Sequence, residues 1–123
     1  MKLDAIVVHG GNPKDGVIKN RWKVATRLYW DSSGKPQVLP AGGKPYANMK
    51  ESEAESGRKL GIEYGIPNHA MPEMEDDSNS MLGHVYKTKL RFIARGKWKN
   101  VAWVTNDIFH YRTNLSVSKI VSS

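Results

Sequence analysis

The chain of 123 residues contains no cysteine. This absence excludes disulfide bonds, metal sites built on thiolates and cysteine nucleophiles. The chain also has no apolar run that approaches the roughly 20 residues of a membrane-spanning helix. The first apolar run begins at residue 3 or 4, which leaves no room for a secretory signal peptide. We therefore expect a protein without a membrane span that resides in the cytoplasm.

The sequence also lacks the common short motifs of phosphate, nucleotide and hydrolase sites. It contains neither G-x-G-x-x-G nor G-x-x-x-x-G-K-[ST], and it has no G-x-S-x-G that would mark a serine hydrolase. The four histidines show no metal-ligand spacing, and the acidic segment around Glu75 does not resemble an EF-hand loop. The sequence therefore predicts no metal site.

The composition is that of one globular domain with an excess of basic residues. Hydrophobic residues make up 39% of the chain and charged residues 25%, and the net charge is +7. Much of the charge lies in "KTKLRFIARGKWK", residues 87–99, where basic residues alternate with apolar ones at helical spacing. This pattern favours the solvated face of an amphipathic helix. Without a helix-turn-helix or RNP-type signature, it disfavours nucleic-acid binding but leaves a basic nucleic-acid-binding module as an alternative.

Apolar periodicity predicts alternating strands and helices. The unbroken apolar run at residues 5–8 is typical of a strand covered on both faces. The same criteria predict a helix over 17–29, a short strand at 38–39 that ends at Pro40, a helix over 51–64 and a helix from 78–80 to 96. A strand and its exit follow over 100–107, then a helix over 109–117 and either a further strand or a frayed end at 120–121. We expect an α/β fold in one three-layer Rossmann-like domain over residues 1–123, with a mainly parallel sheet of four to five strands flanked by helices. Small residues in the 51–64 helix suggest that it packs closely on the sheet.

Two glycine pairs follow the first two predicted strands. Gly10 and Gly11 come after the first strand, and Gly42 and Gly43 come after the second. Because the carboxyl ends of parallel strands meet at one edge of a sheet, we expect both loops at a single rim, next to a helix N-terminus. Such a rim can bind an anion or a polar ligand. The alternative is that these glycines serve only tight turns.

A series of short motifs resembles one known family. The segments "DAIVVHGG", "RWKVATRLY", "VLPAGG", "ESEAE", "GIP", "EDDSNS" and "VTND" are similar in order and spacing to the family of unknown-function domains that includes YdcF, SanA and ElyC. The resemblance runs from about Asp4 to Thr113. It implies a Rossmann-like domain with a polar cleft at the strand ends. The cleft residues that it implies are Gly10, Gly11, Arg21, Gly42, Gly43, Ser52, Glu53, Glu75, Ser78, Thr105, Asn106 and Arg112.

The chain departs from the family pattern at several positions. The segment that begins at Glu75 differs from the usual E-x-x-S-x-N-T-x-E-N. The family commonly has histidine three residues before its late arginine, whereas this chain has Phe109 there and His110 one position later. At the start of a helix this shift would turn the side chain by about 100°. The sequence also ends earlier than is usual in the family, so we expect a truncated C-terminus.

The candidate residues suggest a ligand-binding rim and leave catalysis open. Arg21 could reach over the first loop and fork onto a phosphate or carboxylate. Glu53, Glu75 and His110 are candidate acid–base groups, although the two glutamates could instead hold arginines through ion pairs. We expect binding of a small anionic or nucleotide-like ligand, and the resemblance makes S-adenosylmethionine a candidate. The alternative is a phosphoester or pyrophosphate hydrolase or transferase. His9 is expected to be a core residue.

Overall fold

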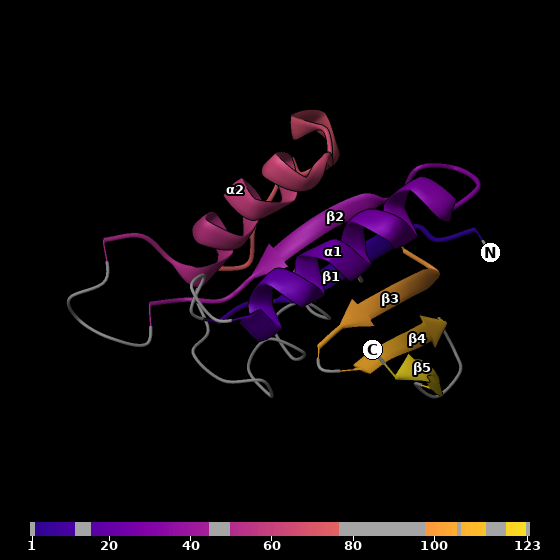
Figure 1. Ribbon diagram of the computed structural model, residues 1–123. Helices are drawn as coiled ribbons and strands as arrows, with labels where there is room; N and C mark the ends of the chain where they lie inside the picture. The colour runs from indigo at the N-terminus through magenta and orange to yellow at the C-terminus, as the bar shows by residue number, and fades with distance from the viewer. Residues whose placement is uncertain are drawn as a thin grey trace.

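The computed structural model describes residues 2–11, 16–44, 50–76, 98–105, 107–112 and 118–122; in the last two segments only the backbone and the Ile108 side chain are described. The elements along the chain are β1 (Ala5–His9), α1 (Gly16–Asp31), β2 (Gln37–Ala41), α2 (Glu53–Tyr64), the short 3₁₀ helix η1 (Asn68–Ala70), β3 (Asn100–Val104), β4 (Asp107–Arg112) and β5 (Ser118–Ser122) (Figure 1). The predicted α/β character is confirmed. The predicted helix that ends at residue 96 lies outside the described residues.

The sheet has the strand order β2-β1-β3-β4-β5. The first three strands run parallel, and their register aligns Val8 with Pro40 on one side and with Val104 on the other. Strands β4 and β5 then extend the sheet in antiparallel pairing. The parallel part therefore comprises three strands. Their carboxyl ends meet at one edge, which we call the rim and define by residues 9–11, 41–43 and 104–105.

The helix predicted over residues 109–117 is wrong where the structure describes it. Residues up to Arg112 form β4, which pairs with β3 from Ile108 opposite Val104 to Arg112 opposite Asn100. The segment "DIFHYR" is rich in aromatic and β-branched residues, which favour a strand when a neighbouring strand is available. A short connection after β3 permits this reversal, since antiparallel strands need no crossover helix.

Helix α1 forms because its apolar residues recur every three or four positions. Ile18, Trp22, Ala25 and Tyr29 are buried on one side of the helix. They pack against the face of the sheet that contains Ile6, Val8 and Val104. Figure 1 shows α1 lying along the sheet, with α2 beside it. The predicted ranges of both helices agree with the structure to within two residues.

Close packing of α2 involves helix α1 rather than the sheet alone. A Cβ atom at Gly57 would lie 2.7 Å from Nε1 of Trp22, and one at Gly61 would lie 2.7 Å from Cζ3 of the same ring. The two glycines of α2 therefore form a flat surface for the fully buried Trp22. The helix ends at Gly65, whose φ of 113° is the left-handed conformation of a helix C-cap.

Strand β2 passes through Pro40 instead of ending there. In a parallel strand the N–H and C=O of one residue point to the same side, and the carbonyl of Pro40 accepts a hydrogen bond from the Glu75 backbone at 2.9 Å. The side of Pro40 on which other residues carry an N–H therefore faces away from β1. The proline consequently removes no hydrogen bond from the ladder between β1 and β2.

The second face of the sheet carries a separate buried cluster. Its side chains are Ala5, Val7, Leu39, Ala41, Trp98, Val101 and Trp103. Both described helices contact the other face, through the cluster built around Trp22. Within the part of the chain that the structure describes, no helix is long and apolar enough to cross a membrane.

Candidate functional site at the strand ends

The two glycine loops meet at the rim, as the sequence predicts. Gly10 follows β1 directly and Gly42 follows β2. A Cβ atom at Gly42 would lie 3.5 Å from Cα of Gly10, so the two backbones are in contact distance. The convergence of the first and second loops is confirmed for these two glycines.

Glu53, the first residue of α2, packs against both glycines. A Cβ atom at Gly10 would collide with the Ala41 carbonyl oxygen and would lie 2.8 Å from Cβ of Glu53. A Cβ atom at Gly42 would lie 2.7 Å from the same Cβ and 3.1 Å from Oε1 of Glu53. Gly42 also has a φ of 139°, which side chains rarely tolerate. The glycines are therefore required by packing and backbone conformation, whatever else they do.

Arg21 connects helix α1 to the first glycine loop. Its Nη1 donates hydrogen bonds to the carbonyl oxygen of His9 at 3.1 Å and to that of Gly10 at 3.4 Å. The side chain is half-buried. Lys19 is exposed on the outer side of α1. Arg21 lies two residues further along, so its side chain leaves the helix about 200° around the axis from that of Lys19. The guanidinium is thus fixed at the rim by the carbonyl groups that terminate β1, and it brings a permanent positive charge there.

The first backbone N–H groups of α2 donate hydrogen bonds to carbonyl oxygens of the second glycine loop. The Glu53 N–H donates to Gly43 O at 2.9 Å, and the Ala54 N–H donates to Gly42 O at 3.0 Å. The N-terminal N–H groups of a helix are the ones that would otherwise bind an anion. At α2 the loop itself satisfies them, so the expected anion site at a helix N-terminus does not form from these groups.

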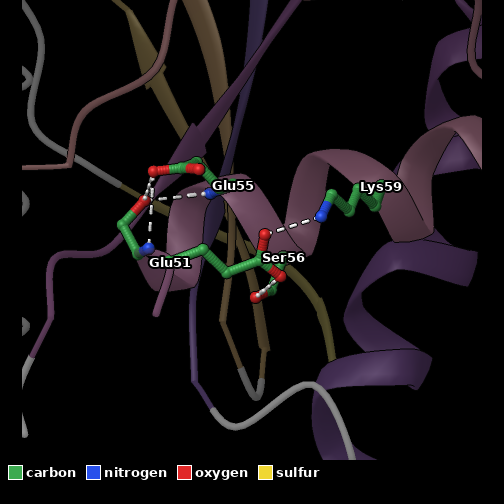
Figure 2. A network of polar contacts seen from close by, with 5 residues as sticks. Glu51, Glu55, Ser56 and Lys59 are labelled. Atoms are coloured by element: carbon green, nitrogen blue, oxygen red, sulfur yellow. Dashed lines mark hydrogen bonds and ion pairs between the residues drawn. The ribbon is translucent and has the colours of Figure 1, made fainter. Parts of the chain in front are cut away.

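Ser52 caps α2 with its side chain. Its Oγ accepts a hydrogen bond from the Glu55 N–H at 3.1 Å, while the Glu55 carboxylate accepts one from the Ser52 N–H at 3.5 Å. Figure 2 shows this reciprocal capping box. Ser52 is only 2% exposed. Its structural role accounts for serine at this position, and the hydroxyl has little surface left for a ligand.

A second polar cluster covers the outer side of the same helix end. Glu51 accepts hydrogen bonds from Lys59 Nζ at 2.6 Å and from Ser56 Oγ at 2.9 Å (Figure 2). The hydrogen bond from Lys59 lowers the pKa of Glu51, and the Ser56 hydroxyl lowers it further. The same contact raises the pKa of Lys59. These contacts join the residue before the Ser52 cap to the first two turns of α2.

Glu75 reaches the rim as a one-residue extension of the sheet. Its N–H donates to Pro40 O at 2.9 Å, and its carbonyl accepts from the Gly42 N–H at 2.7 Å. This forms a parallel bridge with Ala41. The side chain of Glu75 is fully buried. A buried carboxyl group requires polar partners, so Glu75 fits a positioning role better than that of an exposed acid or base.

Thr105 and His9 complete the described part of the rim. Thr105 is half-buried and follows β3 directly. His9 is 1% exposed, and its ring stacks on that of Trp103 with centroids 5.5 Å apart and an interplanar angle of 30°. The interpretation of His9 as a core histidine is confirmed. Sequence reasoning did not single out Trp103, although its place in the strand "NVAWV" was a signal for burial.

The structure does not bring every predicted residue to the rim. The backbone of Arg112 pairs with Asn100 at the start of β3, four residues and about 13 Å from the rim end of that strand. His110 pairs with Ala102 in the middle of the strand. Ser78 and Asn106 lie outside the described residues. Among the residues that are described, no group of three or more histidine, aspartate or glutamate side chains could hold a metal ion.

Comparison of the chain with protein-family models, with curated proteins and with solved structures finds no match. The resemblance to the family of YdcF, SanA and ElyC therefore stays a prediction that rests on the short motifs alone. Among the described residues, the groups at this edge that could contribute chemistry are the guanidinium of Arg21, the half-buried Glu53 and the two closely packed glycine loops.

Proposed function

We propose that the protein binds a small anionic or nucleotide-like ligand at the rim. The observation that carries this proposal is the position of Arg21, whose guanidinium is held at the strand ends by the carbonyl groups of His9 and Gly10. A guanidinium has five N–H donors, and its fork matches the oxygen atoms of phosphate and carboxylate groups. Ligands of open parallel sheets commonly bind beyond the carboxyl ends of the strands, where Arg21 lies.

S-adenosylmethionine is the candidate ligand suggested by the family resemblance. It carries a carboxylate that could pair with Arg21, and ribose hydroxyl groups that could donate to an acidic side chain. Glu53 is half-buried and lies beside Gly10 and Gly42, so its carboxylate is a suitable acceptor. An acidic residue that binds ribose is a recurring device in dinucleotide-binding sheets.

The proposal includes a three-layer Rossmann-like domain. Such a domain needs a layer on each face of the sheet. Helices α1 and α2 supply one layer. Burial of Val7, Leu39 and Trp103 on the opposite face supports a second layer there.

Isothermal titration calorimetry tests the proposal with S-adenosylmethionine, ATP and inorganic pyrophosphate as probes. We expect Arg21→Gln to weaken binding about 10-fold or more, since a hydrogen bond to a charged group contributes about 1.5–3 kcal/mol. Arg21→Lys keeps the charge but loses the fork, and we expect an intermediate affinity. Lys2→Gln removes an exposed cation before β1, at the far end of the sheet, and should leave affinity unchanged.

An NMR titration gives a second and local readout. A ligand at the rim should shift the amide signals of Gly10, Gly11, Gly42 and Gly43 more than those of α2 beyond its first turn. Absence of binding by all three probes at millimolar concentration, or equal affinity in Arg21→Gln and the parent, would count against the rim as an anion site.

A phosphoester or pyrophosphate hydrolase or transferase is the second candidate, and the position of Glu53 favours it. A carboxylate and a guanidinium at one strand edge could serve as general base and charge clamp. Turnover of a phosphoester and pyrophosphate panel, with and without magnesium, tests this candidate. Activity that Glu53→Gln abolishes supports it, and no turnover in the parent removes it.

A further inference from the structure

The outer side of α1 carries a continuous basic stripe with one aromatic ring. Lys19, Lys23 and Arg27 follow one another at steps of four residues, and all three are exposed. Trp30 comes three residues later and is 52% exposed, an unusual value for tryptophan. At 100° per residue the four side chains fall within about 80° of the helix circumference. We call this set the α1 stripe.

No acidic residue of α1 itself interrupts the α1 stripe. Residues 16–30 contain no aspartate or glutamate, and Asp31 is the last residue of the helix. Salt bridges between i and i+4 residues, which usually neutralise a solvated helix face, are therefore absent within this stretch. From Lys19 to Trp30 the stripe extends about 16 Å. It faces away from the rim, because Arg21 lies on the other side of the helix.

The tryptophan ring of the stripe is held in place by its neighbours. The ring of Tyr29 meets it edge-on, with centroids 5.0 Å apart and an interplanar angle of 85°. Lys35 donates a hydrogen bond to the Trp30 carbonyl at 2.7 Å, and its Nζ lies 5.3 Å from the centroid of the indole. The indole is thus a half-exposed platform held by two neighbours, with the Lys35 ammonium group over one face of the ring.

We propose that the α1 stripe binds single-stranded nucleic acid, with phosphates on Lys19, Lys23 and Arg27 and a base stacked on Trp30. Cationic side chains that follow the backbone, combined with an aromatic ring for the bases, are the two components of non-specific single-strand binding. An anionic membrane would also attract the cations, but insertion of Trp30 would drag the Lys35 ammonium toward apolar surroundings. A base stacked on the indole face opposite Lys35 leaves that ammonium hydrated. This surface and partner are independent of the ligand proposed for the rim.

Fluorescence anisotropy with labelled 12-nucleotide oligothymidine and oligouridine tests the proposal. For three phosphate contacts the affinity should fall with salt at a slope of about −2 in log–log form. The double variant Lys19→Gln/Arg27→Gln removes two cations of the stripe. It should weaken binding and reduce the magnitude of the salt slope by about 1.4. Trp30→Ala should weaken binding by about 5- to 150-fold, because it removes one stacked base. Binding of either oligonucleotide in this pattern supports the proposal.

A charge-matched control distinguishes binding at the α1 stripe from general electrostatic attraction of the oligonucleotide to a basic protein. Lys50→Gln/Lys59→Gln also removes two exposed cations, but neither lies on α1, and its affinity should stay within about twofold of the parent. Urea unfolding of each variant checks that the fold is intact. Equal weakening by both double variants would overturn the proposal. So would unchanged affinity in Trp30→Ala, equal affinity for a 12-base-pair duplex, or binding to phosphatidylserine vesicles without binding to either oligonucleotide.

Discussion

Replacing Gly42 by alanine tests the packing of the rim most directly. The backbone φ of 139° disfavours any side chain, and strain of this kind costs about 1–3 kcal/mol. The new Cβ would also lie 2.7 Å from Cβ of Glu53, and such overpacking costs typically about 1–3 kcal/mol. We therefore expect Gly42→Ala to lower the free energy of unfolding by about 2–6 kcal/mol, a large part of the roughly 5–15 kcal/mol of a small domain.

Urea denaturation measures this loss. With a slope m of about 2 kcal/mol/M, the midpoint should fall by about 1–3 M. Gly16→Ala is the matched control, because no atom lies within 4 Å of a Cβ placed there. Gly16 begins α1, so alanine should leave stability unchanged or raise it by up to about 1 kcal/mol.

A double variant separates strain from steric overlap. Glu53→Gly removes the Cβ that the alanine would meet, so Gly42→Ala should cost less in that background, by about the 1–3 kcal/mol assigned to overpacking. The strain at Gly42 would remain. A midpoint shift below about 0.3 M for Gly42→Ala, or an identical cost with and without the Glu53 side chain, would refute this account of the rim.

Three further predictions concern the helices. Trp22→Ala should destabilise the protein by about 3–5 kcal/mol in the same urea assay, because the ring is 1% exposed and fills the space between the helices. Ser52→Ala should cost about 0.5–2 kcal/mol through the lost cap, whereas the exposed Ser33→Ala should fall within about 0.5 kcal/mol of the parent. In Lys59→Gln the pKa of Glu51, followed by carboxyl NMR, should rise toward its ordinary value of 4.5. Because folding lowers the pKa of Glu51, the stabilising effect of this carboxylate is present above pH 4.5 and is lost as the pH falls through the folded pKa. An unchanged Glu51 titration in Lys59→Gln would contradict Lys59 as the cause of the lowered pKa.

The parallel half of the fold could be predicted because its signals are local. The buried residues of α1 recur every three or four positions, and the run at residues 5–8 has no polar interruption. Strand β4 could not be predicted in this way. Its residues form a strand because β3 is beside them, and β-propensity depends strongly on such neighbours. A helical pattern sought in "IFHYR" ignores that neighbour.

The sequence predicts which strand ends form the candidate site, but it does not predict the hydrogen bonds made by the connecting loops. Gly10 and Gly42 converge because parallel strands share an edge, which the sequence already implies. The use of Gly42 and Gly43 carbonyls to satisfy α2, and the addition of Glu75 beside β2, depend on the conformations of the connecting loops. No residue pattern specifies these contacts. The N-terminal amides of α2, which the sequence suggests as anion binders, are therefore already hydrogen-bonded to carbonyl oxygens of the second glycine loop.

Glu53 links the stability of the rim to its proposed chemistry. Its Cβ excludes a side chain at Gly42 and, together with the Ala41 carbonyl oxygen, at Gly10, whereas its carboxylate is the group that could contact a ligand. The two roles reside in different atoms of one residue, so a single substitution can separate them. Glu53→Gln keeps the Cβ and the helix start while it removes the charge. If this variant unfolds like the parent but loses ligand binding or turnover, the carboxylate has a function that packing does not explain.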